Sequence, residues 1–582
     1  MKKRDLIRPA VILMVFLSWL CVAGQSQTNI GVPTWHNDNG RTGKNVRETI
    51  LTPLSINSPS KFGKICTAVT DGQIYAQPLV VANVNIHGNS YSNVVYVVTQ
   101  NDSVYAFDGN SVGPTCTLLL RTRLLQAGDE QAADCHEVVF KTCASIAPLI
   151  GILGTPVIDT RTRTIYVVTQ GQVGNPGTSF FFRLHALDIT TLSNTPEKFG
   201  GPVVVGTSSF AQAHVQRSGM LLLPGVAANG NGMVYFAFEH GVKPWANGYI
   251  YGYDAQNLQA TSAVLRTTPN GTGGGIWQSG AALAAGADSA GGQRYLFPSI
   301  SDGTFDANSP NPPNHDYGES FLKLPANLVP ITPASASTYF TPFNQSCLTS
   351  ADSDFGSAGV LLVPDGALTT HPYLAISAAK DGNIYVMDRT MPGGYNGSSN
   401  TNLQTIPNLG TSTSCKSSHP YFRAAAYWHH YLYYAARGEK LTRYRLLDSC
   451  TQGGPICTDS SSIVETAVTF SAGTTPSISA PSDASSGVVW AMTGAGQVTG
   501  PPYAILYAFD ALNRDANNHL KTLWNSAQCP ASNRDRPGYA TKFTTPTIAN
   551  GRVFIGTQDP SDSTNKRGEL DIYGLNPTRT CN

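Results

Sequence analysis

The chain has 582 residues, a length that ordinarily corresponds to three or four domains. Only 13% of the residues are charged, whereas Gly occurs 56 times and Pro 37 times. This composition disfavours long helices with many charged residues and favours many short strands joined by turns. The formal net charge is +1 and no basic run follows residue 8, which argues against a nucleic acid or an anionic membrane as a charge-driven partner. All-β is the predicted fold class.

The N-terminus has the pattern of a secretory signal peptide. Basic residues within positions 2–8 precede an apolar stretch over residues 10–20, and small residues follow at 22–24. We expect cleavage after Gly24 and an exported mature protein, periplasmic or extracellular, with no stable membrane span. The alternative is an uncleaved anchor, although the apolar stretch is shorter than the roughly 20 residues that cross a bilayer.

Removal of residues 1–24 would leave ten cysteines, an even number in a chain that enters an oxidising compartment. Two pairs are close in sequence and are predicted disulfides, Cys135–Cys143 and Cys450–Cys457. Neither pair has the C-x-x-C spacing or the neighbouring histidines of a zinc site. Structural bridges are therefore preferred over metal or redox roles.

A pair of β-rich strands recurs eight times along the chain, and the second strand of the pair often ends in Asp, as at Asp108. The equivalent positions in the first strand are Tyr96, Tyr166, Tyr235, Phe297, Ile376, Tyr433, Trp490 and Phe554. Their mean spacing is about 65 residues, and a short strand of small residues precedes each copy. Small side chains are typical of an innermost strand, where neighbouring sheets converge on an axis.

A unit of this size cannot bury both faces of its sheet alone, so the copies must stack, and a closed ring leaves only short, protected edges. The sequence thus predicts one eight-bladed β-propeller of four-stranded antiparallel blades over residues 61–576. An N-terminal extension over 25–60 precedes it and a tail over 577–582 follows. The alternatives are a seven-bladed ring with one degenerate copy and two packed sandwiches.

The closure of the ring is also predicted. The last copy ends at Leu575 without an outer strand, whereas the strand-like segment 61–71 has no partners of its own. We expect residues 61–71 to supply the fourth strand of the last blade. Cys66 and Cys581 would then lie near each other, and a third disulfide between them is predicted.

The repeats resemble those of the quinoprotein alcohol dehydrogenases, propellers that bind pyrroloquinoline quinone (PQQ). The family's repeat ends A-x-D-x-x-T-G and is followed by a docking Trp; Ala186, Asp188 and Thr191 keep part of this pattern, and Asp510 is followed by Trp524. The resemblance covers nearly the whole mature chain. It implies a divergent bacterial secreted form of this fold.

A second stretch resembles the family's active site in order: G-G-G-I-W ending at Trp277, S-D-G around Asp302, then Y-G-E and F-T-P. In the family, the Trp forms the floor under the quinone, an Asn in the next turn binds calcium, and an Asp in the following blade is the base. The resemblance therefore implies Trp277 as the cofactor floor, Asp302 and Glu239 as calcium ligands, and Asp354 as the catalytic base. Calcium favours carboxylate oxygens, and a positioned Asp can accept a hydroxyl proton.

The chain also departs from the family. No two cysteines are adjacent, Ser353 precedes Asp354 where the family has Trp, no C-x-x-C-H haem motif occurs, and no basic residue matches the one beside the quinone.

The predicted site residues also have structural interpretations. Trp277 can be a core aromatic between blades, and Glu239 can lie on a loop. The acidic residues near the P-N-P-P-N-H sequence can belong to a solvated loop; they are Asp302, Asp306, Asp316 and Glu319.

Two main hypotheses follow. The first, which we favour, is an exported propeller that binds a small molecule or a protein at its axis, with a degenerate quinoprotein site as scaffold. The second is a PQQ- and calcium-dependent alcohol or sugar dehydrogenase. The first requires only the repeats, whereas an enzyme requires every part of its site. Polysaccharide binding is a third hypothesis, based on the aromatic content alone.

Overall fold

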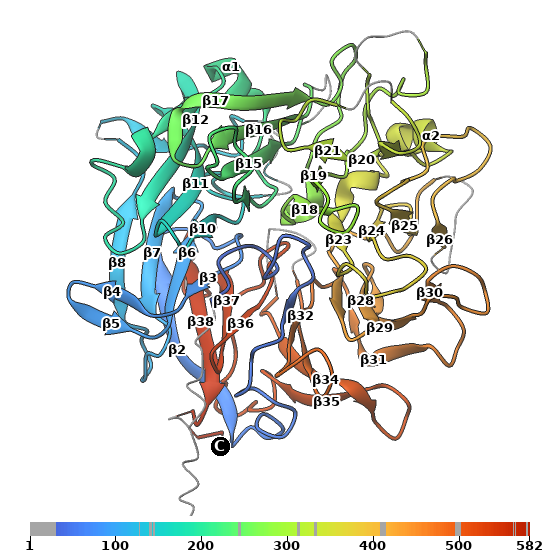
Figure 1. The fold of residues 1–582 in the computed structure, drawn as a ribbon. Coiled ribbons are helices and arrows are strands. Elements are labelled where there is room, and N and C mark those ends of the chain that lie inside the picture. The colour runs from blue at the N-terminus through green and yellow to red at the C-terminus, as the bar shows by residue number, and fades with distance from the viewer. Residues whose placement is uncertain are drawn as a thin grey trace, which may run out of the picture.

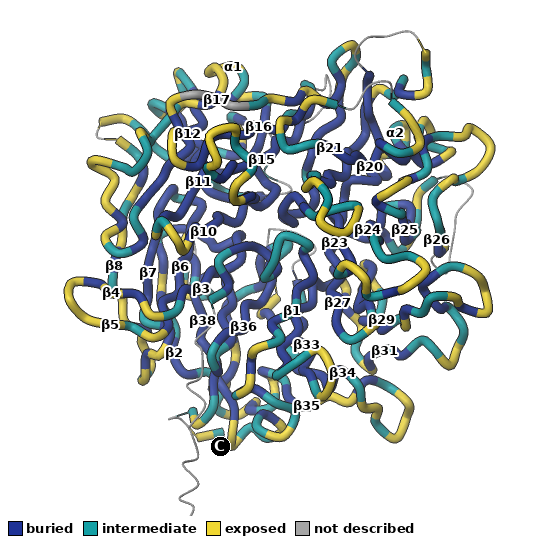
Figure 2. Tube along the Cα trace, in the orientation of Figure 1, coloured by how far each residue is buried: buried dark blue, intermediate teal, exposed yellow. Residues whose placement is uncertain are grey.

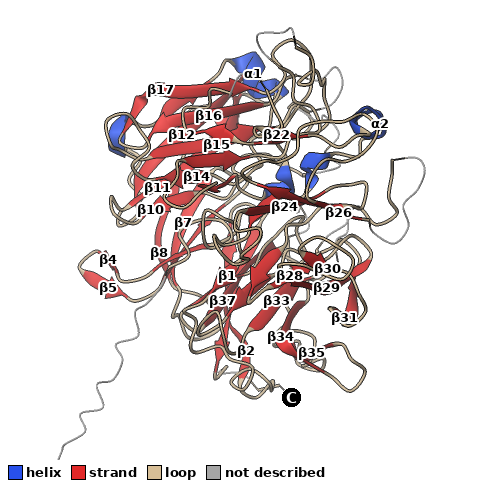
Figure 3. Cartoon of the chain, turned by 45° about the vertical axis from the view of Figure 1, so that its right-hand side comes forward, coloured by secondary structure: helices blue, strands red, loops and turns tan. Residues whose placement is uncertain are grey.

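Short antiparallel sheets radiate around one axis, and the colour in Figure 1 passes round the ring from blue to red. The computed structural model describes residues 31–582 apart from 127, 139–142, 144–145, 242–245, 311–314, 331–333, 408–414, 495–501, 563, 565, 578–579 and 582. The predicted signal peptide lies outside these residues. Strands dominate in Figure 3, and the eight-bladed, all-β propeller is confirmed.

The first four blades are built from the axis outward. Blade 1 holds β3 (Leu79–Val81), β6 (Val94–Val98), β7 (Ser103–Asp108) and β8 (Leu118–Arg123), with the hairpin β4 (Val84–Ile86) and β5 (Asn89–Tyr91). Blade 2 holds β10 (Val157–Asp159), β11 (Thr164–Val173), β12 (Ser179–Asp188) and β13 (Val203–Val205), with β9 (Glu130–Ala132) against β11. Blade 3 holds β14 (Leu221–Leu223), β15 (Met233–Phe238), β16 (Tyr249–Asp254) and β17 (Asn257–Arg266). Blade 4 holds β18 (Ala284–Ala287), β19 (Arg294–Phe297) and β21 (Leu324–Pro325), beside the pair β20 (Phe321–Leu322) and β22 (Tyr339–Phe340).

The last four blades follow the same plan. Blade 5 holds β23 (Val360–Leu362), β24 (Leu374–Ala378), β25 (Ile384–Asp388) and β26 (Gln404–Ile406). Blade 6 holds β27 (Ala426–Trp428), β28 (Tyr431–Tyr434), β29 (Glu439–Leu446) and β31 (Ile463–Phe470), with β30 (Ile456–Cys457) also on β29. Blade 7 holds β32 (Ser477–Ser479), β33 (Val488–Met492), β34 (Leu506–Arg514) and β35 (Leu520–Asn525). Blade 8 holds β36 (Thr547–Ala549), β37 (Arg552–Gln558), β38 (Gly568–Leu575) and β2 (Phe62–Thr70).

The strands of small residues are the innermost ones, as predicted. Neighbouring blades touch through them: β10 contacts β14, β14 contacts β18, β18 contacts β23, and β32 contacts β27 and β36. The predicted closure is confirmed as well, because β2 pairs antiparallel with β38 from Phe62 opposite Leu575 to Thr70 opposite Gly568.

Blade 4 is the least regular blade. Its third strand, β21, spans two residues and ends at Pro325, which has no amide hydrogen to continue a ladder. The chain instead forms the separate pair β20–β22 beside that sheet. The two α-helices, α1 (Ser208–Ala213) and α2 (Gln345–Ala351), also lie in the linkers around blades 3 and 4.

The N-terminal segment from Val32 to Asn45 lies at the centre of the ring (Figure 1) and joins all eight blades. Its carbonyl oxygens accept backbone hydrogen bonds from inner strands, from the amides of Val80, Ile158, Ala285, Leu362, Tyr427, Ile478 and Ala480. The side-chain amides of Asn39 and Asn45 donate to the carbonyls of Leu222 and Ile548 in the two remaining blades. Its β1 (Lys44–Asn45) pairs parallel with β32. The segment thereby satisfies inner strand edges that no other strand covers.

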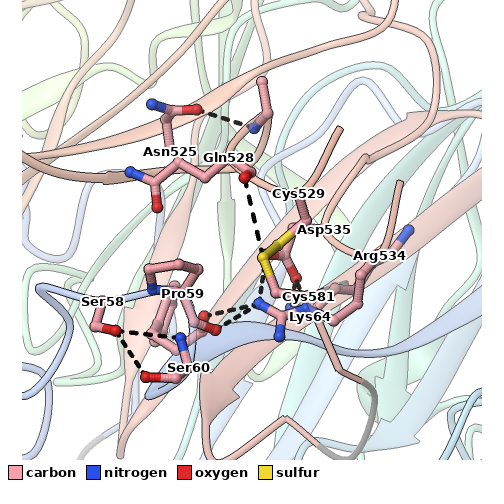
Figure 4. Close-up of a disulfide and its surroundings, with 12 residues drawn as sticks. Ser58, Pro59, Ser60, Lys64, Asn525, Gln528, Cys529, Arg534, Asp535 and Cys581 are labelled. Carbon is pink, nitrogen blue, oxygen red and sulfur yellow. Dashed lines mark hydrogen bonds and ion pairs between the residues drawn. A yellow bond between two sulfur atoms is a disulfide. The ribbon is translucent and has the colours of Figure 1, made fainter. Parts of the chain in front are cut away.

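All ten cysteines of residues 31–582 form disulfides, and both predicted local pairs are present. The prediction of a Cys66–Cys581 bond is wrong. Cys66 lies within the β2–β38 ladder and bonds Cys116 of blade 1, whereas the chain leaves that ladder at its Phe62 end after Leu575. The other pairs are Cys347–Cys415 and Cys529–Cys581. Figure 4 shows the last bond beside Gln528 and Arg534, in the linker between blades 7 and 8.

The core lies between the sheets. The dark blue tube in Figure 2 follows the inner and second strands of each blade, and the yellow segments are loops on the outside of the ring. Because most second strands are buried on both faces, they are continuous apolar runs rather than alternating ones, as in VVYVV of β6. Among the residues that the structure describes, no helix has the length and apolar character needed to cross a membrane.

Candidate functional site

Three of the four predicted site residues are buried carboxylates on consecutive blades. Glu239 directly follows β15 of blade 3, Asp302 lies in the turn after β19 of blade 4, and Asp354 directly precedes the 3-10 helix η3 (Phe355–Ser357) before blade 5. Their exposed fractions are 7%, 5% and 7%. Glu239 lies beyond the end of its strand, as a loop residue would, but its side chain is buried.

A stack of glycine-rich turns brings these carboxylates together. The amide of Ser301 donates to the carbonyl oxygen of Gly275 at 2.9 Å, and the amide of Glu319 donates to the carbonyl oxygen of Ser301 at 2.9 Å. A Cβ atom on Gly275 would lie 2.5 Å from Oε2 of Glu239, so only glycine leaves room for that carboxylate. The segments G-G-G, S-D-G and Y-G-E, which follow one another along the chain, thus form three turns that stack in space.

Two cations lie among the carboxylates. His240 Nε2 is 3.0 Å from Oδ1 of Asp302 and 3.4 Å from Oε1 of Glu239. Lys380 Nζ is 2.5 Å from Oδ2 of Asp354 and 2.7 Å from Oδ1 of Asp352. Lys380 is thus a basic residue beside the predicted base Asp354, which no motif in the sequence identified.

The position of Lys380 in its blade could have identified it. Lys380 comes two residues after β24, the second strand of blade 5, and Glu239 and His240 come one and two residues after β15, the second strand of blade 3. This position of the repeat therefore directs side chains to the carboxylate group. The position of a residue relative to the second strand of its blade is therefore the indication, and no local sequence motif contains it.

Glu319 is a fourth buried carboxylate of the group. It is fully buried, and its Oε2 accepts a hydrogen bond from the amide of Phe355 at 2.6 Å. Asp316 is 1% exposed. Asp302, Asp316 and Glu319 are thus buried and Asp306 is half-buried, whereas residues 311–314 of the loop that they surround lie outside the described residues.

The geometry fits a hard metal ion. Asp302, Asp352 and Asp354 each offer one oxygen, and these oxygens lie within 4.8 Å of one another. Two carboxylate oxygens of the group, Glu239 Oε2 and Asp354 Oδ1, are buried without a hydrogen-bond partner, as is Ser301 Oγ. A buried polar atom without a partner is costly, and hard cations take such oxygens as ligands.

The electrostatics of the group are strongly perturbed. Burial, reinforced by Asp354 and Asp302, raises the pKa of Glu239 to about 7. Burial and then the charge of Asp354 raise the pKa of Glu319 well above its usual range. Burial would lower the pKa of His240, but the carboxylates of Glu239 and Asp302 outweigh it and raise that pKa to about 10. His240 is therefore a cation at neutral pH.

Trp277 contacts Phe543, a residue that lies beside two arginines. It is half-buried, follows Gly275 and Ile276, and precedes the 3-10 helix η2 (Gln278–Gly280). The edge of its ring meets Phe543, with 6.1 Å between ring centroids. The guanidinium groups of Arg217 and Arg423 lie 5.6 Å and 4.8 Å from the centroid of the Phe543 ring.

A cavity of about 580 Å³ lies away from this region, along blade 6, and residues of blades 5 and 7 also line it. Its lining includes Tyr421, Tyr434, Tyr444, Glu439 and Asn518 and none of the four predicted site residues. The predicted site is thus independent of this cavity.

A scan of protein-family models finds no match, and a search of curated proteins finds no relative. Solved structures do match in fold. The quinohemoprotein alcohol dehydrogenases of Pseudomonas putida HK5 and Comamonas testosteroni each align with a TM-score of 0.54 and 12% identity, over 94% of this chain and 81% of theirs. A europium-containing methanol dehydrogenase aligns with a TM-score of 0.54 and 11% identity, over 94% of this chain and 98% of its own.

The chain shares their fold. At 11–12% identity, this likeness is one of fold, and it covers 94% of this chain. The predicted roles of Glu239, Trp277, Asp302 and Asp354 are not tested by it.

Proposed function

We propose that this propeller binds a small ligand at its axis and that a hard metal ion, calcium in the first instance, is part of the site. The observation that supports this proposal is the pair of buried carboxylate oxygens without hydrogen-bond partners, Glu239 Oε2 and Asp354 Oδ1, within one group of carboxylates. Asp302, Asp352 and Asp354, whose oxygens lie within 4.8 Å of one another, would hold the ion together with the neighbouring Glu239. His240 and Lys380 balance part of the negative charge in its absence.

The proposal is tested by titrating the metal-free protein with calcium and, separately, with europium, the metal named for one structural neighbour. We expect saturable binding that raises the thermal unfolding midpoint, because a ligand that binds the folded state stabilises it. Glu239→Gln removes one carboxylate and should weaken binding by at least about tenfold, equivalent to about 1.4 kcal/mol.

The matched control is Glu465→Gln, which removes a carboxylate from the outer strand β31 of blade 6. It should leave the affinity unchanged. The absence of saturable binding of either metal to the wild-type protein, or equal losses in both variants, would contradict the proposal.

A second candidate is a PQQ- and metal-dependent alcohol or sugar dehydrogenase. It is favoured by the contact of Lys380 with Asp354 at 2.5 Å, which gives the predicted base the basic neighbour that the sequence analysis did not find. When bound, the quinone supplies the acceptor for the hydride of the alcohol. Asp354 would accept the hydroxyl proton, Lys380 would hold Asp354 in place, and Trp277 would cover one ring face and exclude water.

This candidate is tested by incubating the metal-free protein with PQQ and calcium, removing the excess, and recording quinone absorbance and dye-linked oxidation of a panel of alcohols and sugars. We expect retained quinone and turnover in the wild-type protein. Trp277→Ala should release the quinone, whereas Asp354→Asn should retain it and lose turnover. Absence of retained quinone in the wild-type protein would eliminate the enzyme and leave the ligand-binding propeller.

We also propose that the protein is exported to the periplasm or the extracellular space. Five disulfides support this, because such bonds persist in oxidising compartments. Mass spectrometry of the mature protein from its native host should find an N-terminus near residue 25. A full-length chain in the cytoplasmic fraction would contradict this proposal.

A further inference from the structure

The cavity along blade 6 is not used by the proposed function, and it has the size of a ligand site. Its volume of about 580 Å³ lies within the roughly 300–1,000 Å³ that is usual for small-molecule pockets. Strands β28, β29 and β31 of blade 6 (Figure 1) contribute Tyr434, Tyr444 and Val464 to its lining. The end of β26 in blade 5 and the turn between β34 and β35 in blade 7 contribute Ile406 and Asn518. None of the carboxylates of the proposed metal site lines it.

Tyr434 brings a hydroxyl group without a partner to this cavity. The residue lines the cavity and is only 2% exposed. Among the described residues, none forms a hydrogen bond with its hydroxyl, and burial is the sole cause that raises its pKa. A hydroxyl that is withdrawn from water without a replacement hydrogen bond is costly. A ligand in the cavity would supply the missing partner.

The preceding residue of the same strand has a different environment. Tyr433 of β28 is fully buried, and its hydroxyl donates to the carbonyl oxygen of Ala511 in blade 7 at 2.8 Å. Successive side chains of a strand point to opposite faces of the sheet, so Tyr433 contacts the next blade whereas Tyr434 lines the cavity. The hydroxyl of Tyr433 is therefore part of the core, and that of Tyr434 is available to a ligand.

Two more tyrosines line the cavity beside Tyr434. The rings of Tyr421 and Tyr434 have 4.6 Å between their centroids and are tilted by 51°. Tyr444 is half-buried, and its hydroxyl interacts with that of Tyr421. Burial raises the pKa of all three phenols, so they are neutral at physiological pH. They present ring carbons and hydroxyl oxygens together.

The charged side chains of the lining are already paired within the protein. Lys440 Nζ lies 3.3 Å from Oε2 of Glu465, and Glu439 Oε1 lies 2.9 Å from Nδ1 of His419. The remaining ionisable side chain besides the tyrosines is that of His519, which also lies beside a carboxylate. An ionic ligand would therefore find no free counter-ion among the described residues of the lining.

We propose that the cavity binds a neutral sugar of one or two pyranose rings. A pyranose has apolar C–H faces and an edge of hydroxyl groups, which both donate and accept hydrogen bonds. Tyr444 and Ile463, both half-buried, offer apolar surface to a face. The Tyr434 hydroxyl and the side-chain amides of Asn517 and Asn518 offer partners to the edge. Polysaccharide binding, the third hypothesis from the sequence, thereby acquires a location, since a free sugar and the end of a polysaccharide present the same chemistry.

The test uses the full mature protein in EDTA, which leaves the proposed metal site empty, and saturation-transfer difference NMR, which detects weak ligands. The probes are glucose, galactose, N-acetylglucosamine, cellobiose and maltose. We expect saturable binding of at least one of them, and we expect tetramethylammonium, a small cation, not to bind. The absence of saturable binding of every sugar, or tighter binding of tetramethylammonium than of any sugar, would overturn the proposal.

Tyr434→Phe removes only the hydroxyl that lacks a partner. It should weaken binding of the sugar by at least about fivefold and leave the thermal unfolding midpoint unchanged, because no hydrogen bond within the protein is lost. Tyr433→Phe is the matched control: it removes the hydroxyl that donates to Ala511, so it should lower the thermal midpoint and retain the sugar. Equal affinities of the wild-type protein and Tyr434→Phe, or equal losses of affinity in the two variants, would overturn the assignment.

Two measurements define the place and the size of the ligand. Glu239→Gln should retain the sugar, because Glu239 does not line this cavity, and loss of binding in that variant would move the sugar to the axis and overturn the proposal. The hexasaccharide that matches the bound disaccharide should bind no more tightly than the disaccharide. Tighter binding of the hexasaccharide would identify a polysaccharide chain as the ligand and overturn the limit of two rings.

Discussion

Two groups of buried charge, the carboxylate group and the pair Arg217 and Arg423, are neutralised in different ways. The carboxylate group contains its own cations, His240 and Lys380, each within 3.0 Å of a carboxylate oxygen. The arginine pair has no anion among the described residues. An internal counter-ion offsets part of the cost of burying a charge, whereas a buried pair without a counter-ion bears that cost in full. Substitutions in the two groups should therefore change stability in different ways.

The largest expected effect comes from Lys380→Met. It leaves Asp354 buried beside the other carboxylates without its cation, and we expect a loss of about 3 kcal/mol in the free energy of unfolding, measured in urea at pH 8. Lys440→Met, which removes a cation from a more exposed pair with Glu465, is the control and should cost less than about 1 kcal/mol. Equal losses would show that Lys380 does not neutralise the carboxylate group.

A smaller effect is expected from pH. The folded-state pKa of Glu239 is about 7, above its usual value of 4.5, so the folded protein binds a proton that the unfolded chain releases. The contribution of Glu239 to stability is therefore lost as pH rises from 4.5 through 7 in the metal-free protein.

A metal ion requires the ionised carboxylate, so calcium affinity should rise about tenfold between pH 6 and pH 8. Calorimetric titration at both pH values measures this change. Glu239→Gln should flatten the pH profile, and an unchanged profile in that variant would remove Glu239 from the metal site.

The smallest expected effect comes from Glu319→Gln. Burial raises the pKa of Glu319 and so favours the neutral carboxyl, and Gln keeps an oxygen for the amide of Phe355. The free energy of unfolding in urea at pH 6 should change by less than about 0.5 kcal/mol.

Asp302→Asn is the comparison. It removes the anion that binds His240 and should lower the free energy of unfolding by about 2 kcal/mol. If Glu319→Gln lowered the stability more than Asp302→Asn, the view that Asp302 carries the negative charge and that Glu319 favours its neutral form would be contradicted.

Much of the fold could be predicted from the sequence, because each blade repeats the same apolar pattern. The inner strands, the number of blades and the pairing of β2 with β38 all follow from that repeat. The path of the N-terminal segment could not be predicted, because its hydrogen bonds use backbone groups and leave no pattern in side chains. The partner of Cys66 was also mispredicted, because it depends on which end of the β2 ladder the C-terminal tail leaves.

The candidate site was predicted in part. Glu239, Asp302 and Asp354 were identified through their order along the chain, and the structure brings all three into one electrostatically coupled group. Lys380 and His240 were missed as their counter-ions. Arg217, Arg423 and Phe543 were missed because each precedes the inner strand of a different blade, and no local motif links them.

The sequence by itself determined the architecture, because a periodic apolar pattern is a local property that every copy repeats. The number of copies then sets the number of blades. Only the tertiary structure decided which charges face one another, since that depends on where turns from distant blades meet. The pairing of Lys380 with Asp354 is a fact of this second kind, and so is the lack of a carboxylate partner for Arg217 among the residues that the structure describes.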